Sequence, residues 1–247
     1  MGTIRNGFAG SSGSSGSTGA SGSSGTGGSG AVIAFPLLTY TWNASLGGQN
    51  GADNASFTGI PIGSASSDRL VIVIISKGNG VGTSINSCTI NGAAATEISA
   101  ATGNGHNNPQ AVYYLKVTSG TTCDMSFTGG GGADSYAVSV FTLTGQSSDT
   151  PVYAGTAVTS AAGTISVSTS SLSNATILAA INSNGDLGTY YWNSPISFDA
   201  YIIAATGQYR GAQLAGHSGI VSGAQTVSVY RSNGTNGNSV LSVVAWQ

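Results

Sequence analysis

From Leu37 to the end of the chain, short apolar runs alternate residue by residue with polar side chains, and clusters of Gly, Asn, Ser and Asp separate the runs. A period of two places alternate side chains on opposite faces of a β-strand. Turn residues at this spacing are typical of sandwiches and barrels. No window has the apolar spacing and caps of an α-helix. The sequence therefore predicts an all-β antiparallel sandwich, jelly-roll-like, over residues 36–247.

The alternation places the expected strands and the core. The strands are expected at Leu37–Leu46, Arg69–Ser76, Ile85–Asn91, Ala94–Ser99, Ala111–Thr118, Thr122–Thr128, Ser135–Thr144, Thr164–Ser168, Ala175–Asn182, Phe198–Ala204, Gln208–Ala215, Ala224–Arg231 and Ser239–Trp246. Their pairing is expected to bury Leu70, Val71, Ile72, Val73, Ile74, Ile75, Val112, Tyr114, Phe127, Val138, Val140, Leu178, Ile181, Val243 and Trp246.

Residues 1–35 are expected to form an extended Gly/Ser-rich arm. Residues 9–30 contain only Ala, Gly, Ser and Thr, and such a segment buries too little apolar area to offset its ordering entropy. One interpretation is a flexible linker. The other is an arm that becomes ordered along neighbouring subunits, with Ile4 and Phe8 as assembly anchors.

The low charge of the chain limits the classes of partner that it can bind. Charged residues make up 6% of the chain, against about 25% in an ordinary soluble domain. The few Lys and Arg are scattered, whereas a nucleic-acid backbone needs clustered basic residues. No apolar run reaches the length of a transmembrane helix. A neutral surface of hydroxyl and amide groups lets copies pack densely, so the composition favours an assembly and excludes nucleic acid and membrane insertion.

Several motifs resemble catalytic or cofactor sites, but the neighbouring residues that such sites need are missing. The apolar run from Leu70 enters a Gly-rich loop as in nucleotide sites, but a strand pattern follows instead of a helix. Gly216-His217-Ser218-Gly219 is not a complete nucleophile turn, since Ile220 follows it. Glu97 is the only Glu, whereas glycoside hydrolysis needs paired carboxylates. We expect a protein that is not an enzyme, with no catalytic residues and no cofactor.

Metal sites are also not expected. His106 and His217 are the only histidines, and the Asp residues lie mostly in turns, which such residues favour. A calcium site at Asp53 with nearby Asn residues is a weaker alternative, since the spacing is not that of an EF-hand.

Cys88 and Cys123 lie on apolar faces of their expected strands. The first interpretation is two reduced thiols in the core. The second is a disulfide between neighbouring strands, and a metal or catalytic role is the weakest because no His or second Cys lies nearby in the sequence.

Tyr190-Tyr191-Trp192 is the best candidate for a ligand or partner surface. The three aromatics follow a turn at Asn182–Asp186, and exposed aromatic side chains bind sugar rings or partner proteins. Burial under a loop or at a subunit contact is the competing interpretation.

The order of strands and turns resembles β-sandwich modules, jelly-roll or concanavalin-like, of bacteriophage structural proteins and bacterial surface proteins. The resemblance covers residues 68–246 and is carried by Asp68–Val73, Cys88–Thr96, Ala111–Val117, Ser119–Phe127, Val138–Gly145, Thr150–Tyr153, Gly163–Val167, Asn174–Ala180 and Ser242–Trp246. It implies that both halves form one sandwich, with a crossing near Thr150, and that the protein sits on a surface or virion.

Together these observations lead us to expect a structural protein of a phage virion: a capsid decoration (cement) protein, or a head or tail fibre protein. It would be assembled in the host cytoplasm onto the virion surface, with other virion proteins and copies of itself as partners. The alternative is a carbohydrate-binding or adhesion module of a tail fibre or cell-surface protein, with a host glycan as ligand.

Overall fold

The computed structural model describes residues 35–47, 54–78, 84–102, 108–130, 135–160, 163–184, 190–193, 195–204, 211–231 and 238–247. Residues 34–247 form one compact unit. All regular structure in the described ranges is β-strand, paired antiparallel, so the all-β prediction is confirmed. Within those ranges no helix is long and apolar enough to cross a membrane. The predicted anchors Ile4 and Phe8 lie outside the described residues.

The first half of the chain forms a two-layer sandwich. Its inner sheet has five strands in the order β1-β9-β3-β7-β6, and its outer sheet has four in the order β2-β8-β4-β5. The bounds are β1 Leu37–Gly47, β2 Asn54–Pro61, β3 Leu70–Lys77, β4 Ser84–Ile90, β5 Ala93–Ala94, β6 Thr96–Thr102, β7 Pro109–Lys116, β8 Thr122–Gly130 and β9 Ser135–Thr144.

The second half forms another sandwich from one seven-stranded sheet that folds over itself. The bounds are β10 Tyr153–Thr159, β11 Gly163–Asn184, β12 Tyr190–Trp192, β13 Ser197–Ala204, β14 Gly211–His217, β15 Val221–Arg231 and β16 Ser239–Trp246. The 22-residue β11 belongs to both layers. Its first part pairs with β15 in an outer layer that also contains β12, and its second part pairs with β14 and β16 in an inner layer.

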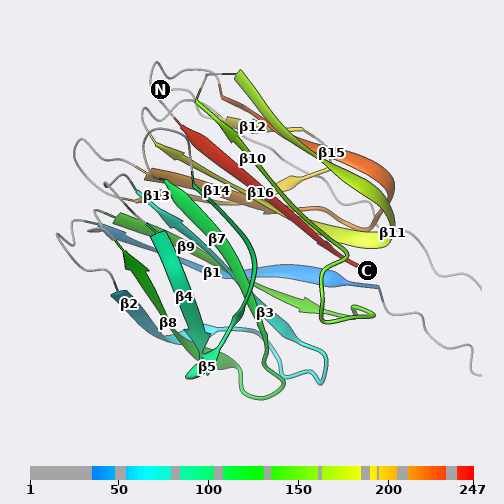
Figure 1. The fold of residues 1–247 in the computed structure, drawn as a ribbon. Coiled ribbons are helices and arrows are strands. Elements are labelled where there is room, and N and C mark those ends of the chain that lie inside the picture. The colour runs from blue at the N-terminus through cyan, green and yellow to red at the C-terminus, as the bar shows by residue number, and fades with distance from the viewer. Residues whose placement is uncertain are drawn as a thin grey trace, which may run out of the picture. The chain divides into compact units, whose positions relative to one another are not determined.

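The two sandwiches stack through their inner sheets, which gives four layers (Figure 1). One apolar core fills each sandwich, and a third lies between the inner sheets. Strand β3 is buried along its whole length, because Val71, Val73 and Ile75 face the first core while Leu70, Ile72 and Ile74 face the central one. A strand buried on both faces carries a continuous apolar run, which explains the sequence from Leu70 to Ile75.

The two sandwiches have the same strand order. The inner sheet β1-β9-β3-β7-β6 corresponds strand by strand to β10-β16-β11-β14-β13. In the outer sheets, β2, β8 and β4 correspond to the first part of β11, β15 and β12. A β-bulge lies at matching places in β6 and β13, between Glu97 and Ser99 and between Phe198 and Ala200. The chain therefore contains one sandwich topology twice.

The sandwiches are related by an approximate two-fold arrangement. Strand β1 lies against β13 and β10 against β6, which are corresponding pairs. The matched registers make Gln110 equivalent to Gln213 and Ser139 equivalent to Ser242. All four side chains are buried. Such self-complementary contacts are those of a symmetric dimer interface, here formed within one chain.

A buried polar network lies at this interface. Ser139 Oγ donates to Gln213 Oε1 at 2.5 Å, and Gln213 Nε2 donates to Ser76 Oγ at 2.8 Å. Asn182 Nδ2 donates to the carbonyl oxygens of Lys77 and Pro109, both at 3.1 Å. Satisfied buried polar groups favour one packing over its alternatives, so the network fixes how the inner sheets align.

The sequence-based strand and core predictions are largely confirmed. Every predicted core residue is buried except Tyr114, which is partly buried. Strands β2, β10 and β12 were not expected, and β11 unites two expected strands. The structure also differs from the single sandwich implied by the resemblance, because residues 145–152 connect two stacked sandwiches rather than crossing within one.

Candidate binding face on the second sandwich

Two tyrosines stack on the exposed face of the second outer layer. Tyr191 on β12 is directly opposite Tyr230 on β15 in the strand register. Their ring centroids are 6.4 Å apart with an interplanar angle of 29°. The side chains are 56% and 44% exposed, so the sheet offers an aromatic surface to solvent.

Hydroxyl and amide groups surround this pair. Thr164 of β11 is opposite Tyr230 and extends the same row. In the next row Asn193 Nδ2 donates to Ser228 Oγ at 2.7 Å. One row further, the Ser168 and Thr226 hydroxyls are 3.2 Å apart. We call Thr164, Ser168, Tyr191, Asn193, Thr226, Ser228 and Tyr230 the tyrosine face.

The predicted cluster Tyr190-Tyr191-Trp192 is divided by the strand. Tyr191 points outward, whereas Tyr190 and Trp192 are partly buried and pack against the core of the second sandwich. Trp192 Nε1 is buried and has no hydrogen-bond partner among the described residues. Neighbouring residues of a strand face opposite sides, so the three cannot form one surface. Tyr230, rather than Tyr190 or Trp192, lies beside Tyr191 on the exposed face. The sequence signal for its exposure was that Tyr230 alternates with the apolar, buried Val227 and Val229.

The first sandwich carries a different pair at the corresponding positions. Matching the core-facing residues of the outer strands, Met125 with Val227 and Phe127 with Val229, places Ser87 where Tyr191 lies and Thr128 where Tyr230 lies. These two hydroxyls hydrogen-bond at 2.7 Å. In the next row Thr89 and Ser126 also hydrogen-bond at 2.7 Å and correspond to Asn193 and Ser228. The same topology therefore forms with small hydroxyl residues where the second sandwich has two tyrosines.

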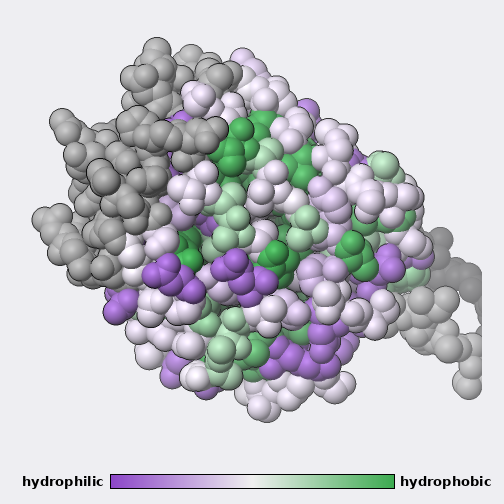
Figure 2. Space-filling model, viewed as in Figure 1, coloured by the Kyte–Doolittle hydropathy of each residue, from purple (hydrophilic) through white to green (hydrophobic). Residues whose placement is uncertain are grey.

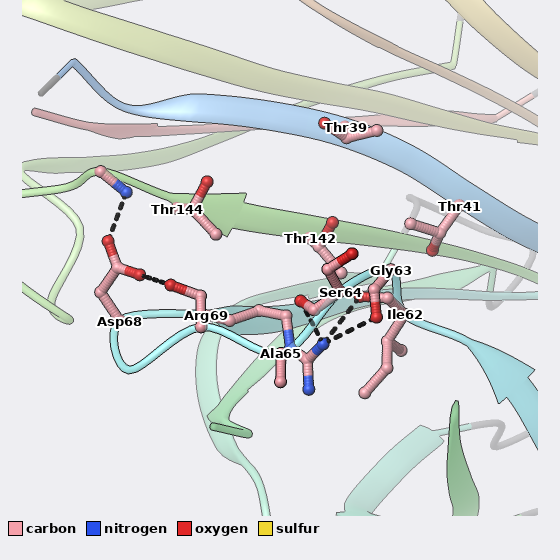
Figure 3. Close-up of a pocket in the computed structure, with 12 residues that line it drawn as sticks. Thr39, Thr41, Ile62, Gly63, Ser64, Ala65, Asp68, Arg69, Thr142 and Thr144 are labelled. Atoms are coloured by element: carbon pink, nitrogen blue, oxygen red, sulfur yellow. Dashed lines mark hydrogen bonds between the residues drawn. The ribbon is translucent and has the colours of Figure 1, made fainter. Parts of the chain in front are cut away.

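A second feature is a pocket of about 530 Å³ between the 62–66 loop and strands β1 and β9. Figure 3 shows Thr39, Thr41, Thr142 and Thr144 along one side and Arg69 on the other. Arg69 is 1% exposed. Its guanidinium donates to carbonyl oxygens of both the 62–64 and 117–120 segments, with N–O distances from 2.7 to 3.2 Å. The Arg69 side chain thus holds the two segments together.

Asp68 ties the same region to the end of β9. Its carboxylate accepts a hydrogen bond from the Ser66 hydroxyl and another from the Gly145 amide at 2.6 Å. The Ser66 hydroxyl and then the Gly145 amide lower the pKa of Asp68, because both stabilise the charged form.

The cysteines are free thiols in the first core, as the first interpretation predicted. Burial raises the pKa of Cys88 to about 12 and that of Cys123 to about 11. The thiolate is the reactive form, so both are unreactive at neutral pH.

The other candidate residues have structural contacts. His217 Nδ1 lies 2.6 Å from the Asp199 carboxylate, and buried Ser218 Oγ accepts the amide of Ile177 at 2.9 Å. Glu97 accepts the Tyr113 hydroxyl at 3.0 Å. In the described part of the chain no three His, Cys, Asp or Glu residues gather as metal ligands. Asp53 and His106 lie outside that part.

The surface seen in Figure 2 is mostly of intermediate hydropathy, with strongly hydrophobic and hydrophilic residues in small scattered areas. Phe35, Leu37 and Ile220 are exposed apolar residues that line a smaller pocket near the first described residue.

Comparison of the chain with protein-family models, curated proteins and solved structures finds no match.

Proposed function

We propose that the protein is a non-catalytic structural component of a bacteriophage virion, a capsid decoration protein or a head or tail fibre protein anchored by its N-terminal arm. The observation that carries the proposal is the low charge of both outer faces, whose described strands expose one carboxylate, that of Asp124. Paired hydroxyl and amide side chains form rows there, including Ser87–Thr128, Thr89–Ser126 and Asn193–Ser228. Copies with such faces can pack closely with little electrostatic repulsion.

Two further observations support the proposal. The stacked sandwiches form one compact unit of residues 34–247, and the 33 residues before it are dominated by Gly and Ser. A chain segment with few bulky side chains can lie in a shallow groove or extend the sheet of a neighbour. The resemblance to phage sandwich modules points to the same setting.

The test is limited proteolysis with mass spectrometry on the isolated protein and on phage particles that contain it. We expect cleavage within residues 1–34 to be fast in the isolated protein and blocked in the particle. Equal cleavage in both samples, or absence of the protein from purified particles, would contradict the proposal.

Variants of the arm sharpen this test. Ile4→Ser combined with Phe8→Ser removes the apolar side chains that could anchor the arm, so we expect less protein in purified particles. Ser11→Ala combined with Ser14→Ala changes the same number of arm residues and is expected to be incorporated normally. Equal incorporation of both variants would show that Ile4 and Phe8 are not anchors.

A further inference from the structure

We propose that the tyrosine face binds a neutral polysaccharide, with Tyr191 and Tyr230 as the stacking residues. This inference goes beyond the proposed function, because the isolated protein would bind such a ligand whether or not it belongs to a virion. It rests on the geometry of the face and on the comparison between the two sandwiches.

The fold does not need these tyrosines. The corresponding positions of the first sandwich hold Ser87 and Thr128 in the same sheet topology. Tyr191 and Tyr230 leave about half of their surface in water, so they contribute little to the core. Large aromatic side chains that stay exposed at a place where small hydroxyl residues suffice indicate a contact with another molecule.

The chemistry of the tyrosine face suits a sugar chain. Aromatic rings offer flat apolar surfaces against which the C–H groups of a sugar ring can pack. Thr164, Ser168, Asn193 and Thr226 are exposed and can exchange hydrogen bonds with sugar hydroxyls, whereas Ser228 is buried and positions the Asn193 amide. Successive rows on one side of a strand are about 7 Å apart, so a sugar chain that lies along the strands meets aromatic and polar groups in turn.

The described residues of the tyrosine face carry no charge at neutral pH. None of the described residues of the tyrosine face is ionisable apart from the two tyrosines. The neighbouring Arg231 is buried, and its guanidinium donates to Ser183 Oγ at 3.1 Å and to Ser239 Oγ at 3.4 Å, away from the face. Anionic polymers are recognised through Arg and Lys clusters. The ligand that fits is therefore a neutral polysaccharide.

The experiment is affinity electrophoresis of the isolated full chain in gels with hydroxyethyl cellulose, dextran or galactomannan. We expect at least one of these neutral polymers to retard the protein. The Tyr191→Ser/Tyr230→Thr variant introduces the residue types found in the first sandwich, so it is expected to fold. We expect it to bind at least about tenfold more weakly, as for aromatic hot spots elsewhere.

The matched control is Ser87→Ala/Thr128→Ala, which changes the corresponding pair of the first sandwich and is expected to bind like the wild type. Circular dichroism and thermal melting of all three proteins establish that they are folded. The proposal is overturned if none of the three polymers retards the wild type, or if the tyrosine variant is retarded as strongly as the control. It is also overturned if the tyrosine variant instead abolishes a concentration-dependent dimer seen by sedimentation, which would assign the face to self-association. Since this assay uses no particles, its result is independent of the test for a virion protein.

Discussion

At the residue scale, single polar side chains fix how the larger parts fit together. Gln213 joins both inner sheets through Ser139 and Ser76, and Arg69 joins two loops through their carbonyl groups. These side chains sit where alternation alone predicts apolar residues. Their burial is tolerated because each polar group has a partner.

Gln213→Leu should weaken the interface between the sandwiches. The substitution leaves the buried Ser139 hydroxyl without its acceptor, while Ser76 keeps the hydrogen bond from Gln110. A buried polar group that loses its partner costs about 1–3 kcal/mol. Urea unfolding should show the corresponding loss of unfolding free energy. Gln225→Leu is the control, because Gln225 donates at an exposed position, where most substitutions change stability by less than about 0.5 kcal/mol. Equal effects of the two changes would argue against the network.

The protein should lose the stabilising contribution of Asp68 in acid. Its pKa is lowered in the folded state, so the stabilisation is present above its unfolded pKa of about 3.9 and is lost as the pH falls through the folded value. Asp68→Asn removes this contribution, so we expect the variant to melt below the wild type at pH 7 and the difference to shrink below pH 4. Melting curves recorded from pH 7 to pH 2.5 test this. A constant difference over that range would contradict it.

At the scale of strands, β11 bends where it passes from the outer to the inner layer. Its pairing with β15 is irregular from Ser168 to Ala175, and Asn174 has a positive φ of 49°. Asn adopts this left-handed conformation more readily than other residues with a side chain. The strand is thus one continuous segment with a built-in corner.

Asn174→Val should destabilise the protein by about 1–2 kcal/mol, because a β-branched residue is strained at positive φ. Asn174→Gly should be close to neutral, since glycine has no such restriction. Ser166→Val is the control for adding Val to the regular, exposed part of β11. Thermal unfolding of the three variants gives the comparison, and equal losses for both Val variants would count against strain at Asn174.

The sequence predicted those strands whose side chains alternate cleanly or are buried on both faces. Strands β3, β8 and β9 belong to this group, since their apolar residues meet one or two cores. Strand β2 was missed because only Ile60 of its eight residues is buried, and β12 because it has three residues. In the candidate site, Tyr191 was found from its aromatic neighbours. Tyr230 could not be linked to it, because only the pairing of β12 with β15 brings the two together.

At the scale of the whole molecule, the same sandwich occurs twice. The duplication was not apparent in the sequence, since β2 and β3 are separate strands whereas the equivalent β11 is continuous. Matching positions also hold different residues. Lys77 on β3 donates to the Gly130 carbonyl in the first sandwich. The equivalent residue of β11 is Ser183, which instead accepts a hydrogen bond from Arg231 on β15. Strand order and register, not residue identity, reveal the relationship.

The two sandwiches should stay together when the connection between them is cut. Buried residues of both inner sheets, among them Ile72, Phe141, Leu178 and Trp246, form the central core. We would insert a protease site between Ser147 and Ser148, cleave the folded protein, and measure its mass by sedimentation. We expect one species of unchanged mass that separates only in denaturant. Dissociation in buffer would mean that the covalent link holds the halves together.

Because strand β11 is continuous, the second sandwich should resist a pulling force differently from the first. In the first sandwich, β2 and β3 are joined by the 62–69 loop, so tension on the outer sheet can peel it from the inner sheet once the Arg69 contacts break. In the second sandwich the same peeling would have to straighten a strand that is hydrogen-bonded in both layers. Under load, the first outer sheet is therefore the part that opens before the second.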